Sequence, residues 1–224
     1  MKLDVTTWKR WVDWSERIEE SLSNTLGFKA IHDCFAEVVM ENAEHIDKHH
    51  GGTFYDLVRY GYGVQAAMAV RRQVKNDKGS VSLARLLDQI NKCSEQFTYE
   101  FYLERFPLKG ERTFPGWQED TFNGFSEDGK IISRDVIARD QKEIETLNTE
   151  IGAYVDRVLA HDDIKGRELG TTYKKIDDAL AVVDRIACRY IALLTSNGYA
   201  TLMAQNDYPW QGIFKVPFDI RDEM

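Results

Sequence analysis

The chain has 224 residues and a formal net charge of −8, with 43% hydrophobic and 12% aromatic side chains. This length suits a single domain over residues 1–224, with a core large enough to fold without disulfide or metal crosslinks, and the apolar content excludes an intrinsically disordered chain. The acidic balance disfavours nonspecific coating of nucleic acid, which requires many Lys and Arg side chains, but it is compatible with a local basic patch.

The spacing of the cysteines and the hydropathy of the sequence indicate the cellular compartment of the protein. Cys34, Cys93 and Cys188 are widely spaced and include no CxxC pair, so neither a disulfide framework nor a thiolate metal site is expected. The first residues hold no apolar signal core, and the sequence lacks an apolar run long enough to cross a bilayer, which predicts no membrane segment. A reducing cytoplasm is the expected location.

Hydrophobic periodicity predicts an all-α bundle of five to six helices, with almost no strand-like alternation. The first helix is expected over about residues 6–22, where tryptophans and aliphatic residues recur at three- and four-residue steps. The second is expected over about residues 28–49, after a stop at Leu26-Gly27.

The third helix is expected to begin after Gly51-Gly52, with Thr53 as its N-cap. A heptad-like spacing predicts that its inward seam consists of Phe54, Leu57, Gly61, Val64, Met68 and Arg71. Nearby small residues would let a neighbouring helix approach closely.

The fourth helix is expected from Ser80 or Ser82 to near Pro107. Residues 108–132 follow no helical or strand period, yet their aromatic side chains require burial, which predicts a long ordered loop. These aromatic residues are Phe114, Trp117, Phe122 and Phe125.

The fifth helix is expected to begin near Ser133 and to carry its apolar seam as far as His161. The sixth is expected from Thr171 or Thr172 to about Ser196, with a regular seam of Ile176, Leu180, Val183, Ala187, Tyr190 and Leu194. The remaining tail is expected to lay aromatic side chains across the bundle as a C-terminal strap.

Several catalytic signatures do not occur: GxxxxGK[ST], GxGxxG, GxSxG and HExxH. Their absence excludes nucleotide hydrolysis on a P-loop, dinucleotide redox chemistry and an α/β-hydrolase mechanism. Glu41, His45 and His49 are spaced by four and resemble a metal-binding ladder, but no fourth ligand is evident, so no metal is expected.

The end of the fifth helix is the most informative segment. His161 falls on the apolar seam and Arg157 precedes it by one helical turn, so the two side chains can share a cleft. A histidine beside a fixed cation can act as the general base of phosphodiester cleavage while the arginine holds the phosphate. The alternative is a histidine that only stabilises the C-terminal helix dipole.

Basic residues also gather at the end of the third helix, where Arg71 continues the inward seam beside Arg72. A half-buried arginine requires a carboxylate or a phosphate partner. A purely structural salt bridge would use Asp156, Asp162 or Glu168, whereas a substrate phosphate would make Arg71 and Arg72 binding residues.

Three stretches together resemble the abortive-infection, AbiU-like branch of the HEPN superfamily. They are YGYGVQAAMAVRRQVKNDKGSVSLARLLDQI, YVDRVLAHDD and YIALLTSNGYATL with the later YPWQGIFKVPF. The resemblance implies a helical bundle, frequent homodimerisation, and a role in phage defence or toxin–antitoxin systems. Catalytic members of the superfamily are ribonucleases that need neither metal nor cofactor.

The motif of those ribonucleases joins an arginine, a polar residue and a histidine. Placing the histidine at His161 puts Asp156 at the polar position, but Arg157 is then one residue too close to His161. The resemblance therefore implies either a ribonuclease with His161, Arg157 and Asp156 in its site, or a non-catalytic interaction or antitoxin-like protein with a degenerate motif. The expected partners are a second copy of the chain, RNA or a nucleotide, or a protein held by the aromatic loop around residues 114–125.

Overall fold

The computed structural model describes residues 2–48, 51–106, 116–156 and 171–203. These segments contain eight α-helices and no strand, which confirms the all-α fold. The helices are α1 (Val5–Glu41), α2 (Ala43–Lys48), α3 (Gly52–Val74), α4 (Leu83–Lys92), α5 (Tyr99–Arg105), α6 (Trp117–Asn123), α7 (Arg134–Leu147) and α8 (Tyr173–Thr195), with a 3-10 turn η1 (Ser94–Gln96) and a π-helical turn η2 (Asn148–Gly152).

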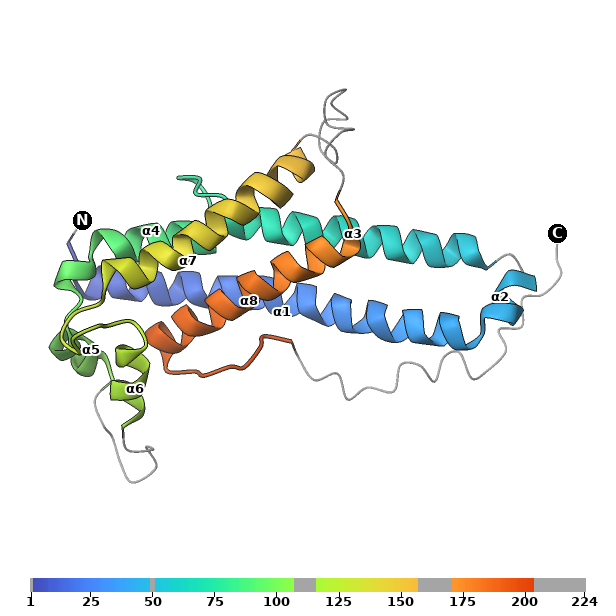
Figure 1. Ribbon diagram of the computed structural model, residues 1–224. Helices are drawn as coiled ribbons and strands as arrows, with labels where there is room; N and C mark the ends of the chain where they lie inside the picture. Colours follow the sequence, from blue (N-terminus) through green and yellow to red (C-terminus); the bar gives the residue numbers. More distant parts are fainter. Residues whose placement is uncertain (1, 49–50, 107–115, 157–170, 204–224) are drawn as a thin grey trace.

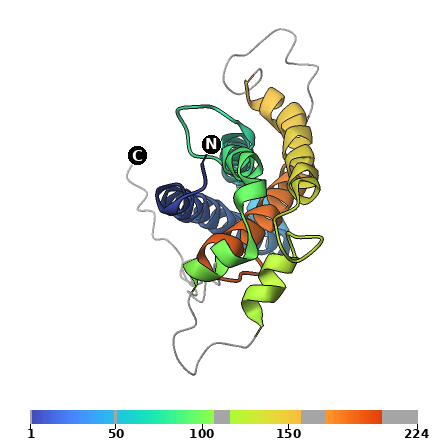
Figure 2. The same cartoon turned by 90° about the vertical axis from the view of Figure 1, so that its left-hand side faces the viewer.

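Two long antiparallel helices, α1 and α3, run the length of the molecule, and α8 lies across both of them (Figure 1). Helices α4 and α7 pack together, α5 and α6 lie near the N-terminal end of α1, and α2 joins α1 to α3 at the opposite end. Viewed from the α5 end, α1 and α7 lie on opposite sides with α4 and α8 between them (Figure 2). The buried side chains form one cluster in this space.

The N-terminal half of α1 contributes three tryptophans to that core. Asp4 caps the helix by accepting a hydrogen bond of 2.8 Å from the amide of Thr7. Trp8, Trp11 and Trp14 are buried, as their spacing predicts, and the fully buried Trp11 donates its indole N–H to Gln89 on α4. The tryptophan stripe therefore sets how α1 meets α4.

The expected break at Leu26-Gly27 is wrong, because α1 continues without interruption to Glu41. Leu22 and Leu26 are both buried one turn apart, so the packed face continues through the glycine. Gly27 itself faces open space and has no positive φ. A glycine inside a helix costs only about 1 kcal/mol, and the burial on either side outweighs that cost.

The expected seam of α3 is also wrong. Phe54, Leu57 and Met68 are exposed, whereas the opposite, small-residue face is buried. The buried residues of α3 are Tyr62, Gly63, Ala66, Ala67, Ala69, Val70, Gln73 and Val74. Small side chains let α1 and α8 approach the backbone closely: at Gly63 a Cβ atom would lie only 2.6 Å from the Tyr173 ring. The helix begins at Gly52 with Gly51 as the N-cap residue, so Thr53 is not the cap.

The fourth expected helix is divided into α4, η1 and α5. The helical path breaks at residues 97–98, because the backbone there pairs with residues 130–132: Tyr99 N–H donates to Lys130, and Ile132 N–H donates to Phe97. The long loop expected over residues 108–132 is helical in part, since α6 lies within it; residues 107–115 lie outside the described part of the chain.

The last two long helices begin at the predicted positions. Ser133 caps α7 and Thr172 caps α8, and each side-chain oxygen accepts a hydrogen bond from a backbone N–H in the first turn. All six residues of the predicted α8 seam are buried. Residues 204–224, where the aromatic strap was expected, lie outside the described residues.

Candidate functional site

A charged cluster joins the last turn of α3 to the end of the α7 segment. Arg71 donates from Nε to one carboxylate oxygen of Asp156, and Lys75 donates from Nζ to the other at 2.8 Å. All three side chains are about one-third exposed, so water and ligands can reach them. The two cations also lie at the C-terminal end of α3, where the helix dipole favours positive charge.

The π-helical turn η2 separates α7 from Asp156. A π turn inserts one extra residue per turn and rotates the faces of the helix beyond it, and such turns are frequent at functional sites. Gly152 lets the Asn148 side chain lie against the turn, because a Cβ atom at this position would lie 2.6 Å from Oδ1 of Asn148 and would force that side chain to move. Since η2 packs directly against α3, the turn brings Asp156 to the cations of α3.

The charge state of Asp156 follows from its neighbours. Burial raises the pKa of the carboxyl group, but hydrogen bonds from Lys75 and Arg71, together with their positive charges, outweigh burial and hold the pKa below its usual value. Asp156 is therefore ionised at neutral pH. Its contribution to folding stability is present above the unfolded-state pKa and is lost as the pH falls through the lowered pKa.

The structure identifies a carboxylate partner of Arg71. Its partner is Asp156, one of the three carboxylates that the sequence offered. Asp162 and Glu168 lie outside the described residues, as do Arg157 and His161. Because Asp156 directly precedes Arg157 in the sequence, the cluster fixes the chain at the point where the candidate catalytic segment begins.

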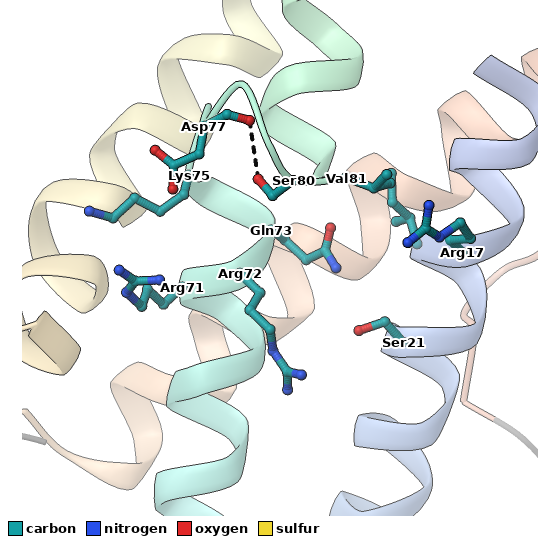
Figure 3. A pocket seen from close by; sticks show the side chains of 10 residues that line it. Arg17, Ser21, Arg71, Arg72, Gln73, Lys75, Asp77, Ser80 and Val81 are labelled. Atoms are coloured by element: carbon teal, nitrogen blue, oxygen red, sulfur yellow. Dashed lines mark hydrogen bonds between the residues drawn. The ribbon is translucent and has the colours of Figure 1, made fainter. Parts of the chain in front are cut away.

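The side chains of Arg71 and Arg72 lie on different sides of α3. Arg71 turns toward Asp156, whereas Arg72 points toward α1, and its Nε donates to the carbonyl of Met68 (Figure 3). Arg72 lies instead on a cavity of about 270 Å³ between α1 and α3. Sequence reasoning missed the α1 side of this cavity, Arg17 and Ser21, because no motif links residues about fifty positions apart.

The histidine ladder does not form one continuous surface. Helix α1 ends at Glu41 and α2 begins at Ala43, so Glu41 and His45 stand on different helices, and His49 lies outside the described residues. Within the described ranges, no three His, Cys, Asp or Glu side chains are grouped closely enough to hold a metal ion.

Two further observations concern cysteines and hydropathy. None of the three cysteines forms a disulfide, and Cys93 and Cys188 are buried. Burial, reinforced by the charge of Asp184, raises the pKa of the Cys188 thiol to about 12, so this thiol is not a nucleophile at neutral pH. None of the helices in the described segments is long and apolar enough to cross a membrane.

Comparison with known proteins identifies the family. The model of the AbiU2 family of HEPN domains matches residues 12–208, which include α3, the π turn, Asp156 and α8. No curated protein and no solved structure gives a significant match. Since the matched segment covers most of the chain, the chain belongs to the AbiU2 family of HEPN domains.

Proposed function

We propose that this protein is a cytoplasmic abortive-infection protein that cleaves RNA without a metal ion or cofactor. One observation carries the proposal: in a chain of the AbiU2 family, two cations of α3 hold Asp156 directly before the segment with Arg157 and His161. A site for phosphodiester cleavage requires a base, positive charge for the phosphate and fixed geometry. The named residues can supply all three.

The reaction uses the substrate's own 2′-hydroxyl as nucleophile. His161 accepts the 2′-hydroxyl proton, and the oxygen attacks the adjacent phosphorus. The bond from phosphorus to the 5′-oxygen of the next nucleotide breaks and that oxygen takes up a proton from water, which leaves a 2′,3′-cyclic phosphate and a 5′-hydroxyl end. Arg157 holds the phosphate and Asp156 orients the cations. Among the described residues, Arg71 bonds to Asp156 through Nε alone, so its two Nη groups can donate to a phosphate.

The test is an assay of the purified protein on labelled tRNA and on a pool of structured RNAs, with EDTA present throughout. The proposal predicts cleavage that EDTA does not reduce and products that end in 2′,3′-cyclic phosphate. Cleavage that stops on chelation, or that leaves 3′-hydroxyl ends, would mean a different mechanism.

A non-catalytic role is the second candidate, and the charge pairing favours it. Asp156 neutralises part of the positive charge of Arg71 and Lys75, as expected of a purely structural salt bridge. The aromatic loop is a poor contact surface, however, because Phe122 and Phe125 are buried in the core. An interaction protein would bind RNA or a protein partner stably in the same assay and leave the RNA intact.

We further propose that the protein is a homodimer. Helix α8 covers only part of α1 and α3, and the ends of these two helices near α2 extend beyond it (Figure 1). Large apolar side chains are exposed there: Phe28, Ile31 and Met40 on α1, and Phe54, Leu57 and Tyr60 on α3. An exposed apolar surface of this kind is typical of a protein interface.

Replacing Leu57 with Glu is expected to weaken the dimer at least about tenfold, because the interface would then bury an unpaired charge. Leu57 is 65% exposed in the single chain, so folding is not affected. Sedimentation analysis over a range of concentrations measures the change. Thr146→Glu on the exposed surface of α7 is the control with the same charge. A wild-type protein that sediments as a monomer at all concentrations would contradict the homodimer.

A further inference from the structure

The cavity between α1 and α3 is surrounded by hydrogen-bond donors (Figure 3). It is lined by Arg17, Ile18 and Ser21 of α1, by Arg71, Arg72 and Gln73 of α3, and by Lys75, Asp77, Ser80 and Val81 of the following segment. Arg71 and Lys75 turn away from α1 toward Asp156. Arg17, Ser21, Arg72 and Gln73 are the polar side chains that face the space between the two helices.

Gln73 is a largely buried residue whose side-chain amide has a fixed orientation. Only 3% of the residue is exposed, and its Oε1 accepts a hydrogen bond of 3.1 Å from the backbone N–H of Leu83. This bond identifies the oxygen of the amide, so the NH₂ group is the end that points toward α1 (Figure 3). Within the described segments the NH₂ group makes no hydrogen bond, and because it is not one of the buried unpartnered polar atoms, it is accessible from the cavity.

The two arginines supply positive charge beside this amide. Arg17 forms no ion pair or hydrogen bond with the described residues, and Arg72 uses only Nε, on the carbonyl of Met68. The carboxylate of Asp77 also lines the cavity, but it points away from Ser21 and Gln73 (Figure 3). Two guanidinium groups, a hydroxyl and an amide NH₂ therefore line one cavity, and Asp77 is the one carboxylate among the described residues that line it.

We propose that this cavity is a binding site for the phosphate group of a small phosphorylated ligand of mononucleotide size. A phosphate is an acceptor of several hydrogen bonds with up to two negative charges, which matches a set of donors that includes two arginines. The volume of about 270 Å³ exceeds the needs of a phosphate alone, and Ile18 and Val81 offer an apolar wall for the rest of the ligand. The site does not depend on RNA cleavage, since Arg17, Ser21 and Gln73 have no part in that reaction.

Calorimetric titration of the RNA-free protein with AMP, inorganic phosphate and adenosine tests the proposal. AMP and phosphate are expected to bind saturably and adenosine is not. Tighter binding of AMP assigns the site to a nucleotide, and equal affinities assign it to free phosphate. If the wild-type protein binds neither AMP nor phosphate, or binds adenosine as tightly as AMP, the proposal is wrong.

Two variants locate the binding. Arg17→Gln is expected to weaken AMP binding about tenfold or more, since a charge-assisted hydrogen bond is lost. Lys9→Gln removes the same charge from an exposed position two turns away on α1 and should leave the affinity unchanged. Gln73→Glu keeps the acceptor for Leu83 but replaces the NH₂ donor with a carboxylate oxygen, which should abolish binding while circular dichroism confirms the helical fold. Equal affinities of the Arg17→Gln and Lys9→Gln proteins would overturn the assignment.

Discussion

Replacing His161 with Ala is expected to lower the rate of RNA cleavage by about 100-fold or more, the usual effect of removing a general acid or base. Without the imidazole the proposed site loses its general base, because the lowered pKa of Asp156 makes that carboxylate a weak proton acceptor. Arg157 and the cations at the end of α3 still bind the phosphate. The loss should therefore appear in the single-turnover rate constant at saturating protein, with RNA binding largely retained.

His45→Ala is the matched control for this experiment. His45 is an exposed histidine of α2, at the opposite end of the molecule from α4 and α5. Its replacement should leave the cleavage rate within about twofold, since a surface substitution away from the site changes neither the base nor the fold. A His161→Ala protein as active as the His45→Ala protein would remove His161 from the mechanism.

Replacing Asp140 with Ala is expected to lower the free energy of unfolding by about 3 kcal/mol. Asp140 of α7 is 2% exposed and accepts hydrogen bonds from Arg189 Nη1 at 2.8 Å and from the Tyr190 hydroxyl at 3.0 Å. The substitution leaves the fully buried Tyr190 hydroxyl and a partly buried guanidinium without this acceptor. Urea denaturation monitored by circular dichroism measures the loss.

Asp178→Ala provides the comparison on α8. Its ion pair with Lys174 is exposed on the surface, and such pairs contribute at most about 1 kcal/mol. The difference between the two variants isolates the cost of breaking a buried network rather than that of losing one aspartate. Similar unfolding midpoints for both variants would show that the Asp140 network does not hold α7 to α8.

The predicted apolar seams of α8 and α3 differ in success for a physical reason. On α8 a single apolar stripe exists, and the core buries it completely. On α3 two stripes exist, one of large and one of small residues, and periodicity alone selects the larger side chains. The core uses the small stripe because α1 and α8 must come close to the α3 backbone, as the contact of Gly63 with Tyr173 shows.

The positions where helices end depend on tertiary contacts, which local sequence patterns do not reveal. Gly27 resembled a helix stop, yet burial of Leu22 and Leu26 carries α1 through it. Phe97 resembled one more residue of a helical seam, yet its backbone bonds to Ile132, more than thirty residues later. The helix caps could be predicted because they depend on local contacts. Ser133 and Thr172 each accept a hydrogen bond from the first turn of the helix that they cap.

The charged site was predictable in part. A half-buried Arg71 required a hydrogen-bond acceptor, and the sequence offered three carboxylates in and after the predicted fifth helix. The selection of Asp156 depends on the π turn at residues 148–152, for which periodicity carries no signal. The cavity with Arg17 and Gln73 was not predictable, because it depends on how α1 and α3 are aligned along their lengths.

A substrate with one 2′-deoxynucleotide tests the central claim most directly. The cleavage position in a chosen RNA is first mapped in EDTA, and the nucleotide on its 5′ side is then replaced by the 2′-deoxy form. If the 2′-hydroxyl is the nucleophile, cleavage at that bond is lost while other cleaved bonds in the same RNA react as before. Undiminished cleavage at the substituted bond would contradict the proposed reaction, since the attacking oxygen would then have to come from water.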